Sequence, residues 1–152
     1  MNQNPSLHTS RASGGTAVED LASPSNFPDQ LTEIYPVPPL ARRNDAKRSI
    51  DFDANMKIFR HLVANGATRI VYGGNAFVYQ ITMAEYAELT HWLSDLANEA
   101  IVIPGVGSSY GRAMDQAPLI RRYGFPSVLV LPTGDPRDAV GMERGMREIA
   151  DA

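Results

Sequence analysis

Three residues that follow a short apolar run are the first candidates for chemistry in this chain. Gly73, Gly74 and Asn75 come directly after Ile70–Tyr72 and precede a helix-start signal. Backbone N–H groups exposed by adjacent glycines, together with the amide of Asn75, can bind an anion such as a carboxylate. The two glycines also suit a tight turn between a strand and a helix. The sequence leaves both interpretations open.

The other chemistry-bearing residues form no familiar constellation. His8, His61 and His91 share no metal-ligand spacing, so we expect no metal site. The chain contains no cysteine, which excludes disulfides and thiolate chemistry and fits a reducing cytoplasm. We expect no cofactor.

Composition excludes several classes of protein. The chain has 152 residues, 43% of them hydrophobic, with a net charge of -3. Basic residues form no stripe, which argues against nucleic-acid binding. No apolar run reaches the roughly 18 residues of a membrane helix, so we expect a cytoplasmic protein that contacts no membrane.

The chain divides into a tail and one domain. Residues 1–32 are rich in Ser, Asn, Gly and Pro and lack hydrophobic periodicity, which predicts a flexible tail. The tail has no apolar core of the kind that secretory signals contain. Residues 33–152 are predicted to form the folded domain.

The first half of that domain reads as two strand–helix units. A strand is predicted at 34–38, followed by a helix that Asp51 caps and Gly66 ends. A second strand is predicted at 70–72. Thr82–Glu85 has the pattern of a capping box, which opens the next helix. Five residues of that helix recur at helical spacing and are predicted to face the core: Met83, Tyr86, Leu89, Leu93 and Leu96.

Two further units follow. Residues 100–107 read as a buried strand, and the helix after it ends at Gly124. A fourth strand is predicted at 127–132 and a last helix at 138–151, with three apolar residues on one side: Met142, Met146 and Ile149. Apolar strands with little alternation indicate a sheet covered on both faces. The fold class is therefore α/β with parallel βα repeats.

Three short motifs occur in the order found in a known family. They are "ANG" at 64–66, "PGVG" at 104–107 and "VLVLP" at 128–132. From Ile34 to Ala152 the chain resembles the N-terminal half of the dihydrodipicolinate synthase / N-acetylneuraminate lyase family of class I aldolases. The resemblance implies the first four βα units of a TIM (β/α)8 barrel, with substrate loops at the C-terminal ends of the strands.

The resemblance also implies a substrate class. Family members form a Schiff base between a lysine on strand six and pyruvate or a related keto acid. The loop after their second strand reads Gly-Thr-Thr-Gly-Glu and holds the substrate carboxylate. Gly73, Gly74 and Asn75 occupy this position and are the expected substrate-binding residues for a small keto acid. The hydroxyl residues and the acid of that loop are replaced here.

Several catalytic features of the family have no match in these residues. A complete barrel takes about 250 residues, and strands five and six would carry the relay tyrosine and the Schiff-base lysine. The only lysines are Lys47 and Lys57, in a loop and on an outer helix. The aromatic pair that follows strand four in the family is replaced by Thr133 and Gly134. We therefore expect a truncated half-barrel that is inactive alone, with no catalytic residue of its own.

A few polar residues have two interpretations each. Asp135 and Arg137 either face a ligand after the fourth strand or form a solvated pair. Tyr110 either reaches the mouth of the site or packs on its helix. Ser108 or Ser109 is expected to cap that helix.

Two other functions fit the same pattern. A half-barrel exposes two sheet edges, so the chain is alternatively a non-catalytic binding protein. It would form a homo-oligomer or pair with a second half-barrel or with a full-length relative. A small doubly wound protein of flavodoxin type is the other alternative. The loop after the first predicted strand, "PPLARRND", does not resemble a phosphate-binding loop, which disfavours it.

Overall fold

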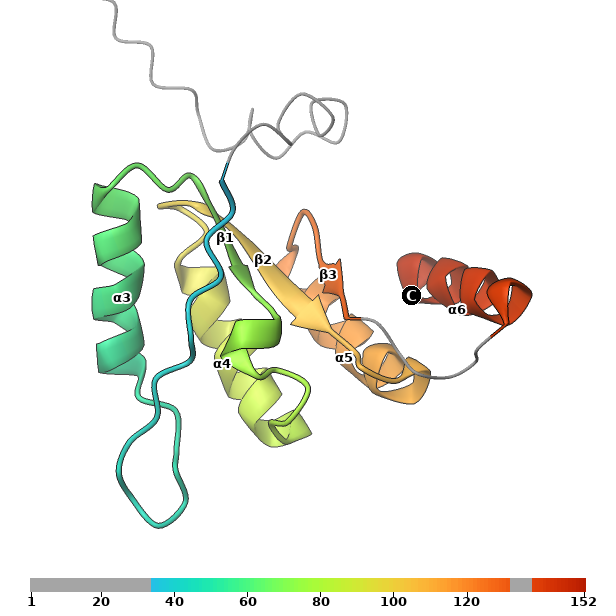
Figure 1. Cartoon of the computed structure of the whole chain (residues 1–152), viewed down its shortest axis with the longest axis horizontal. Coiled ribbons are helices and arrows are strands. Elements are labelled where there is room, and N and C mark those ends of the chain that lie inside the picture. Colours follow the sequence, from blue (N-terminus) through green and yellow to red (C-terminus); the bar gives the residue numbers. More distant parts are fainter. Residues whose placement is uncertain (1–33, 132–137) are drawn as a thin grey trace, which may run out of the picture.

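The computed structural model of the chain describes residues 34–131 and 138–152. In chain order, with the labels of Figure 1, the elements are α3 (Phe52–Ala64), β1 (Arg69–Tyr72), the 3-10 helix η2 (Gly74–Ala76), α4 (Met83–Asp95), β2 (Ile101–Val106), α5 (Tyr110–Tyr123), β3 (Leu129–Val130) and α6 (Ala139–Asp151). The predicted tail, 1–32, lies outside the described residues. Within the described ranges, no helix is long and apolar enough to cross a membrane.

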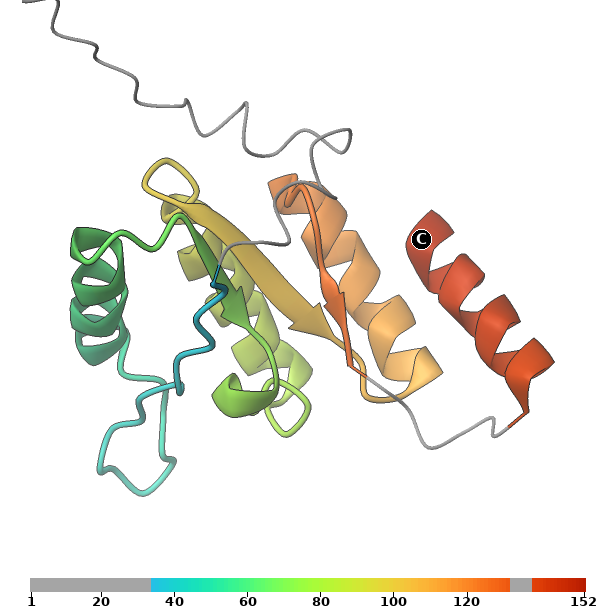
Figure 2. The ribbon, with the colours of Figure 1, turned by 45° about the horizontal axis from the view of Figure 1, so that its top comes forward.

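The strands form one parallel sheet in the order β1-β2-β3. Arg69 of β1 pairs with Ile101 of β2, and Gly105 of β2 pairs with Leu129 of β3. Helices alternate with the strands, and α4 and α5 lie behind the sheet (Figure 2). The predicted α/β class with parallel βα repeats is confirmed.

Side chains at the helix ends explain where the helices begin and stop. Asp51 accepts a hydrogen bond from the first turn of α3, and Ser109 does the same for α5. Thr82 and Glu85 form the complete capping box of α4. Gly124 ends α5 with a φ of 65°, a conformation that glycine adopts at little cost. Each of these signals was readable in the sequence.

The main core lies between the sheet and the helices. Four of the five residues predicted for the core side of α4 are almost fully buried: Tyr86, Leu89, Leu93 and Leu96. They pack with Ile70 and Tyr72 of β1 and with Phe59 of α3. Burial of such side chains is the main source of stability for this layer.

A smaller apolar cluster occupies the opposite face of the sheet. Val71, Ile101 and Ile103 are buried there, and Tyr35 and Val37 pack against them. Side chains alternate between the two faces along a strand, so this face holds the residues that the helices do not cover. In a complete barrel this face would be the interior.

The segment 34–38 is extended but forms no strand, which corrects the first prediction. Its contact with the sheet includes one hydrogen bond, from the N–H of Val71 to the carbonyl of Pro36, at 3.0 Å. Pro36 and Pro38 have no N–H to donate in return. The prolines therefore allow the segment to lie along β1 but prevent a regular ladder.

The C-terminal elements also differ in part from expectation. Of the described part of the predicted strand, 127–131, only Leu129 and Val130 form β3, and Pro132 lies outside the described residues. The last helix is confirmed, and Ile149 is buried on it, but Met142 and Met146 are 45% and 51% exposed. In the described residues, α6 packs mainly on α5, so most of its apolar side lacks cover.

Candidate functional site

The loop after β1 is a closed turn with two free donors. The N–H of Ala76 donates to the carbonyl of Gly73 at 3.1 Å, and that of Phe77 donates to Gly74 at 3.0 Å. The N–H groups of Gly74 and Asn75 find no acceptor among the described residues. Gly74 is partly exposed and Asn75 is exposed. The glycines therefore make the tight turn that was expected, and anion binding by the adjacent donors stays a prediction.

The side chain of Asn75 joins the turn to the extended segment. Its Nδ2 donates to the carbonyl of Val37 at 3.1 Å. An amide nitrogen has two hydrogens, so this bond leaves one for another acceptor. Asn75 therefore serves first as a brace between β1 and the segment beside it.

Close backbone approach explains the glycines at the strand ends. A Cβ on Gly105 would lie 3.0 Å from Cγ2 of Val78 and 3.1 Å from Cα of Gly73. A Cβ on Gly73 would lie 2.7 Å from Cδ2 of Leu129. Gly73 and Gly105 thus leave room for the side chains of Leu129 and Val78 and for the close approach of their own backbones.

The loop after β2 is fixed by a buried glutamine. Gly107 has a φ of 95°, and its N–H donates to Oε1 of Gln116 at 2.8 Å. Gln116 is fully buried, and its Nε2 has no hydrogen-bond partner. Gln116 of α5 therefore anchors the glycine loop through Oε1, while its Nε2 group remains an unused hydrogen-bond donor.

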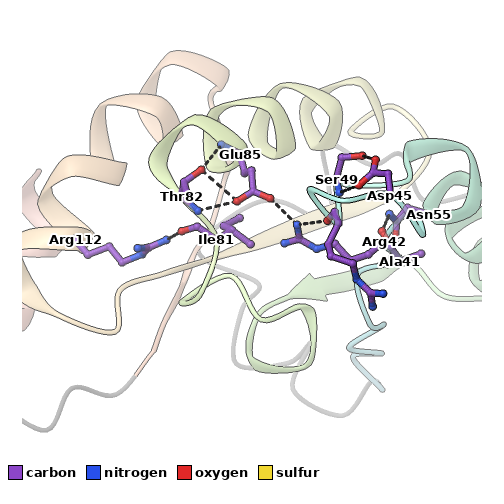
Figure 3. A network of polar contacts seen from close by, with 10 residues as sticks. Ala41, Arg42, Asp45, Ser49, Asn55, Ile81, Thr82, Glu85 and Arg112 are labelled. Atoms are coloured by element: carbon purple, nitrogen blue, oxygen red, sulfur yellow. Dashed lines mark hydrogen bonds and ion pairs between the residues drawn. The ribbon is translucent and has the colours of Figure 1, made fainter.

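A polar network crosses the same end of the sheet (Figure 3). Nη1 of Arg42 donates to Oε1 of Glu85 at 2.5 Å and to the carbonyl of Arg48 at 2.9 Å. Oε2 of Glu85 accepts from the N–H of Thr82 at 2.9 Å. The Thr82 N–H, and then the Arg42 guanidinium, lower the pKa of Glu85 below its usual value. Glu85 is therefore an ionised anchor rather than a proton donor.

Arg112 reaches across from α5 to the loop after β1. Its Nη2 donates to the carbonyl of Val78 at 3.2 Å and also to the carbonyl of Ile81 (Figure 3). Val78 and Ile81 are themselves buried. The segment between η2 and α4 is thus fixed both by its side chains and by its carbonyls.

The tyrosines near this end have structural partners. Tyr86 donates to the carbonyl of Gly105 at 2.9 Å, and burial raises the pKa of this phenol well above its usual range. Tyr110 donates to Oε2 of Glu148 at 2.6 Å, so it joins α5 to α6. Tyr110 is directed to α6 by this bond, and Ser109, not Ser108, caps the helix.

The described residues hold no obvious nucleophile or metal ligand set at this site. Lys47 and Lys57 are both exposed, on the loop before α3 and on α3. No group of three or more His, Asp or Glu within 34–131 and 138–152 could hold a metal ion. Asp135 and Arg137, like Thr133 and Gly134, lie outside the described residues. What the described part offers is a pair of donors for an anion.

Sequence reasoning missed three residues that shape this region. Arg42 lies in a basic stretch, "ARRNDAKR", which signals charge but not its partner. Arg112 has no neighbouring acid in sequence that would indicate its two carbonyl acceptors. Phe77 has a φ of 53°, which no sequence pattern predicts for a phenylalanine.

Comparison with solved structures finds similar folds in several enzymes that share one name. No protein-family profile and no curated protein matches the chain. Among solved structures, dihydrodipicolinate synthase from Bacillus clausii is 22% identical with a TM-score of 0.71, over 82% of this chain and 43% of that one. The Bacillus anthracis enzyme is 26% identical with a TM-score of 0.64, over 77% and 41%. The Aquifex aeolicus enzyme is 17% identical with a TM-score of 0.67, over 77% and 40%.

The chain therefore spans less than half the length of the synthases that it matches. Its parallel βα units superpose on part of their barrels, while the sequences differ at about four positions in five. The described residues have the fold of a partial TIM barrel of the dihydrodipicolinate synthase type, which supports the family that the sequence motifs indicate.

Proposed function

We propose that this chain is a member of the dihydrodipicolinate synthase / N-acetylneuraminate lyase family and binds the carboxylate of a pyruvate-like keto acid. The carboxylate is held by the N–H groups of Gly74 and Asn75, with the remaining Nδ2 hydrogen of Asn75. The observation that carries the proposal is this pair of adjacent N–H groups without an acceptor among the described residues. They lie at the C-terminal end of β1, where barrel enzymes place their substrate loops.

The charge of the surroundings supports an anion at this place. Arg42 and Arg112 both approach the same end of the sheet. Two acids belong to the network with them (Figure 3): Glu85, whose charge is taken up by Arg42 and by the cap of α4, and Asp45, which accepts hydrogen bonds from Ser49. Backbone donors without a competing carboxylate are a common way to bind a small anion.

Schiff-base chemistry is not proposed for these 152 residues alone. A Schiff-base amine must be neutral near pH 7, which requires desolvation or a neighbouring cation. Lys47 and Lys57 are exposed, on the loop before α3 and on α3 itself, and neither is desolvated. The proposed activity of a carbon–carbon lyase belongs to a complete barrel, and this chain supplies the carboxylate-binding part.

Titration of the nitrogen-15-labelled chain with pyruvate tests the proposal. We expect the amide signals of Gly74 and Asn75 to shift in a saturable way. Asn75→Asp should weaken binding about tenfold, because it removes a donor and adds a like charge. Asn65→Asp is the matched control, since Asn65 is an exposed residue after α3, at the opposite end of the sheet.

Two results would contradict the proposal. One is the absence of any saturable shift at Gly74 and Asn75, which would leave the turn as a structural feature only. The other is a pyruvate adduct on Lys47 or Lys57 after borohydride reduction, since this would show amine catalysis where none is proposed.

A second candidate function is association with another copy or with a second half-barrel. Leu129 on the edge strand β3 is 40% exposed. Met142 and Met146, which share one side of α6, are about half exposed. Figure 1 shows β3 and α6 in the same half of the molecule, away from α3. An apolar edge of this kind favours pairing with further βα units.

Light scattering at several protein concentrations separates this candidate from the first. Association through this end predicts a discrete dimer that Met146→Lys dissociates. Val140→Lys is the control, because Val140 is 77% exposed on the other side of α6 by helical spacing. A monomer at all concentrations would exclude the self-pairing form of this candidate.

A further inference from the structure

An exposed pair of aromatic rings stands beside the candidate carboxylate site. Phe77 is 52% exposed, although most large apolar side chains of this loop are buried. Its ring centroid lies 5.9 Å from that of Tyr79, and the two ring planes meet at 50°. The two rings are therefore tilted relative to each other and do not form one flat surface.

The backbone of Phe77 is in a conformation that its residue type disfavours. Its φ is 53°, in the left-handed region, where a bulky side chain crowds the following carbonyl. Glycine or asparagine would occupy this position with less strain. Strained residues of this kind persist where the surroundings hold them, and they concentrate at ligand sites.

The surroundings of Phe77 do hold it. Val78 and Ile81 are buried at 1% and 2% exposure, so the chain on its C-terminal side is anchored in the core. Arg112 donates to the carbonyls of both residues. The capping box of Thr82 and Glu85 follows at once. The ring is exposed on a loop whose backbone is anchored, so a ligand that binds it orders the ring and not the loop.

The aromatic pair is one turn away from the two free N–H groups. The N–H of Phe77 donates to the carbonyl of Gly74 at 3.0 Å, so the residues are the ends of one turn. The ends of such a turn lie within about 7 Å of each other. A molecule whose carboxylate reaches Gly74 and Asn75 can place a group attached two or three bonds away against the rings.

We propose that Phe77 and Tyr79 are a subsite for an aromatic or large apolar group of the ligand, so that this site prefers aromatic keto acids to pyruvate. The inference rests on the proposed carboxylate site. Ring-to-ring contact and removal of the Phe77 face from water supply the preference. Gly74, Asn75 and Phe77 then act together, the first two on the carboxylate and the third on the apolar end.

A protein partner is a less suitable occupant for these rings. The neighbouring Gln80 and Asn75 are exposed and polar, so the apolar area around the pair is small. A stable protein interface needs about 800 Å² from each partner. The other exposed large hydrophobic residues described belong to other parts of the chain: the extended segment (Ile34), α5 (Tyr110), β3 (Leu129) and α6 (Val140, Met142 and Met146).

The test compares the affinities of pyruvate and phenylpyruvate for the 152-residue chain by calorimetry. We expect phenylpyruvate to bind about tenfold more tightly, which is the usual scale for one aromatic contact with burial. Phe77→Asn should remove this difference and leave pyruvate affinity within about twofold of the unaltered chain. Asparagine tolerates the left-handed conformation, so the loop should keep its shape. Phe77→Tyr, which keeps the ring, should retain the preference.

The possible results separate the subsite from the carboxylate site. If pyruvate binds and phenylpyruvate binds no better, the aromatic subsite is overturned and the proposed function stands. If neither binds, both are overturned. If Phe77→Asn changes the oligomeric state and not the ratio of affinities, the rings are a protein contact and the subsite is overturned.

Discussion

Asn55 completes both backbone hydrogen bonds of Ala41. Its Oδ1 accepts from the N–H of Ala41 at 2.8 Å, and its Nδ2 donates to the carbonyl of Ala41 at 3.0 Å. The same nitrogen also donates to the carbonyl of Asp51. Asn55 is 1% exposed, so α3 holds the start of the loop that carries Arg42 through one buried amide.

Removing this amide should destabilise the fold strongly. We expect Asn55→Ala to lower the free energy of unfolding by about 2 kcal/mol, because it leaves the N–H of Ala41 without a partner. It also removes one of two bonds to the Ala41 carbonyl, which still accepts from the N–H of Asp51 at 3.0 Å. Denaturant unfolding followed by circular dichroism measures this value. Asn65→Ala, at the C-cap of the same helix, is the control: its side-chain hydrogen bond to the carbonyl of His61 is exposed, and we expect a loss of less than about 0.5 kcal/mol. Equal losses of unfolding free energy in the two variants would show that the buried hydrogen bonds of Asn55 stabilise the fold no more than the exposed bond of Asn65.

Glu85→Gln should destabilise the chain in a way that depends on pH. In the folded chain the pKa of Glu85 lies below its ordinary value of 4.5, because the Thr82 N–H and Arg42 favour the carboxylate. A lowered folded pKa gives stability that is present above pH 4.5 and is lost as the pH falls through the folded value.

The expected loss for Glu85→Gln is therefore about 1 kcal/mol at neutral pH, from the weaker cap and the lost ion pair. The difference from the unaltered chain should shrink in acid below pH 4.5. Unfolding curves across this range measure it, with Glu88→Gln as control, since Glu88 is exposed on the same helix. A loss that is constant with pH would contradict the role of the charge.

Two glycine substitutions should have unequal effects. A Cβ at Gly105 meets backbone atoms of Gly73 and Tyr72 at 3.1 Å, and these cannot move without disturbing the sheet. A Cβ at Gly73 meets only side chains, chiefly the end of Leu129, which is partly exposed and can turn aside. We expect Gly105→Ala to destabilise by about 2 kcal/mol and Gly73→Ala by less than about 1 kcal/mol. Thermal unfolding ranks the stabilities of the two variants. Adding Leu129→Ala to Gly73→Ala should remove the remaining steric clash. A larger loss for Gly73→Ala than for Gly105→Ala would contradict the described approach of the strands.

Filling a cavity between α5 and α6 should stabilise the chain. The cavity has a volume of about 200 Å³ and is lined by α5, the residues before β3 and the end of α6, with Ala113, Ala117 and Ile149 among its walls. Ala117→Leu places three more carbons in this space, and we expect a gain of about 1 kcal/mol in the free energy of unfolding. Ala84→Leu, at an exposed position of α4, should change stability little. A loss for Ala117→Leu would mean that the helices already pack closely there.

Local signals account for the parts of the fold that the sequence predicts. Asp51, the Thr82–Glu85 box and Gly124 act on the turn in which they occur, so their effect can be read without knowing the tertiary structure. The apolar runs of β1 and β2 likewise indicate buried parallel strands. These elements were placed within a residue or two.

Long-range pairing accounts for the parts that the sequence does not predict. Residues 34–38 can form a strand only if their N–H groups donate to the carbonyls of β1. Pro36 and Pro38 have no N–H, so these hydrogen bonds cannot form. Glu85, the partner of Arg42, lies 43 residues further along the chain. Ile81, a partner of Arg112, lies 31 residues before it. No local sequence pattern indicates partners at such separations. The exposure of Phe77 likewise depends on its backbone conformation and not on its hydrophobicity.

The candidate site is still a prediction from the sequence. Gly73, Gly74 and Asn75 were chosen as the carboxylate-binding residues, and that assignment stays a prediction until a ligand is tested. The structure adds that Asn75 is partly committed to Val37. A side-chain amide can serve a ligand or the backbone, and only the three-dimensional position of the acceptor decides how much of it is left.

The prolines beside β1 make the two edges of this sheet chemically different. On that side the extended segment has carbonyls but lacks the N–H groups of Pro36, Pro38 and Pro39, so it is a poor template for another strand. On the other side, β3 pairs only with β2 among the described residues. A sheet that can recruit a strand at one edge only stops growing after a single partner is added. Self-association through the backbone would therefore end at a pair and would not propagate into a fibre.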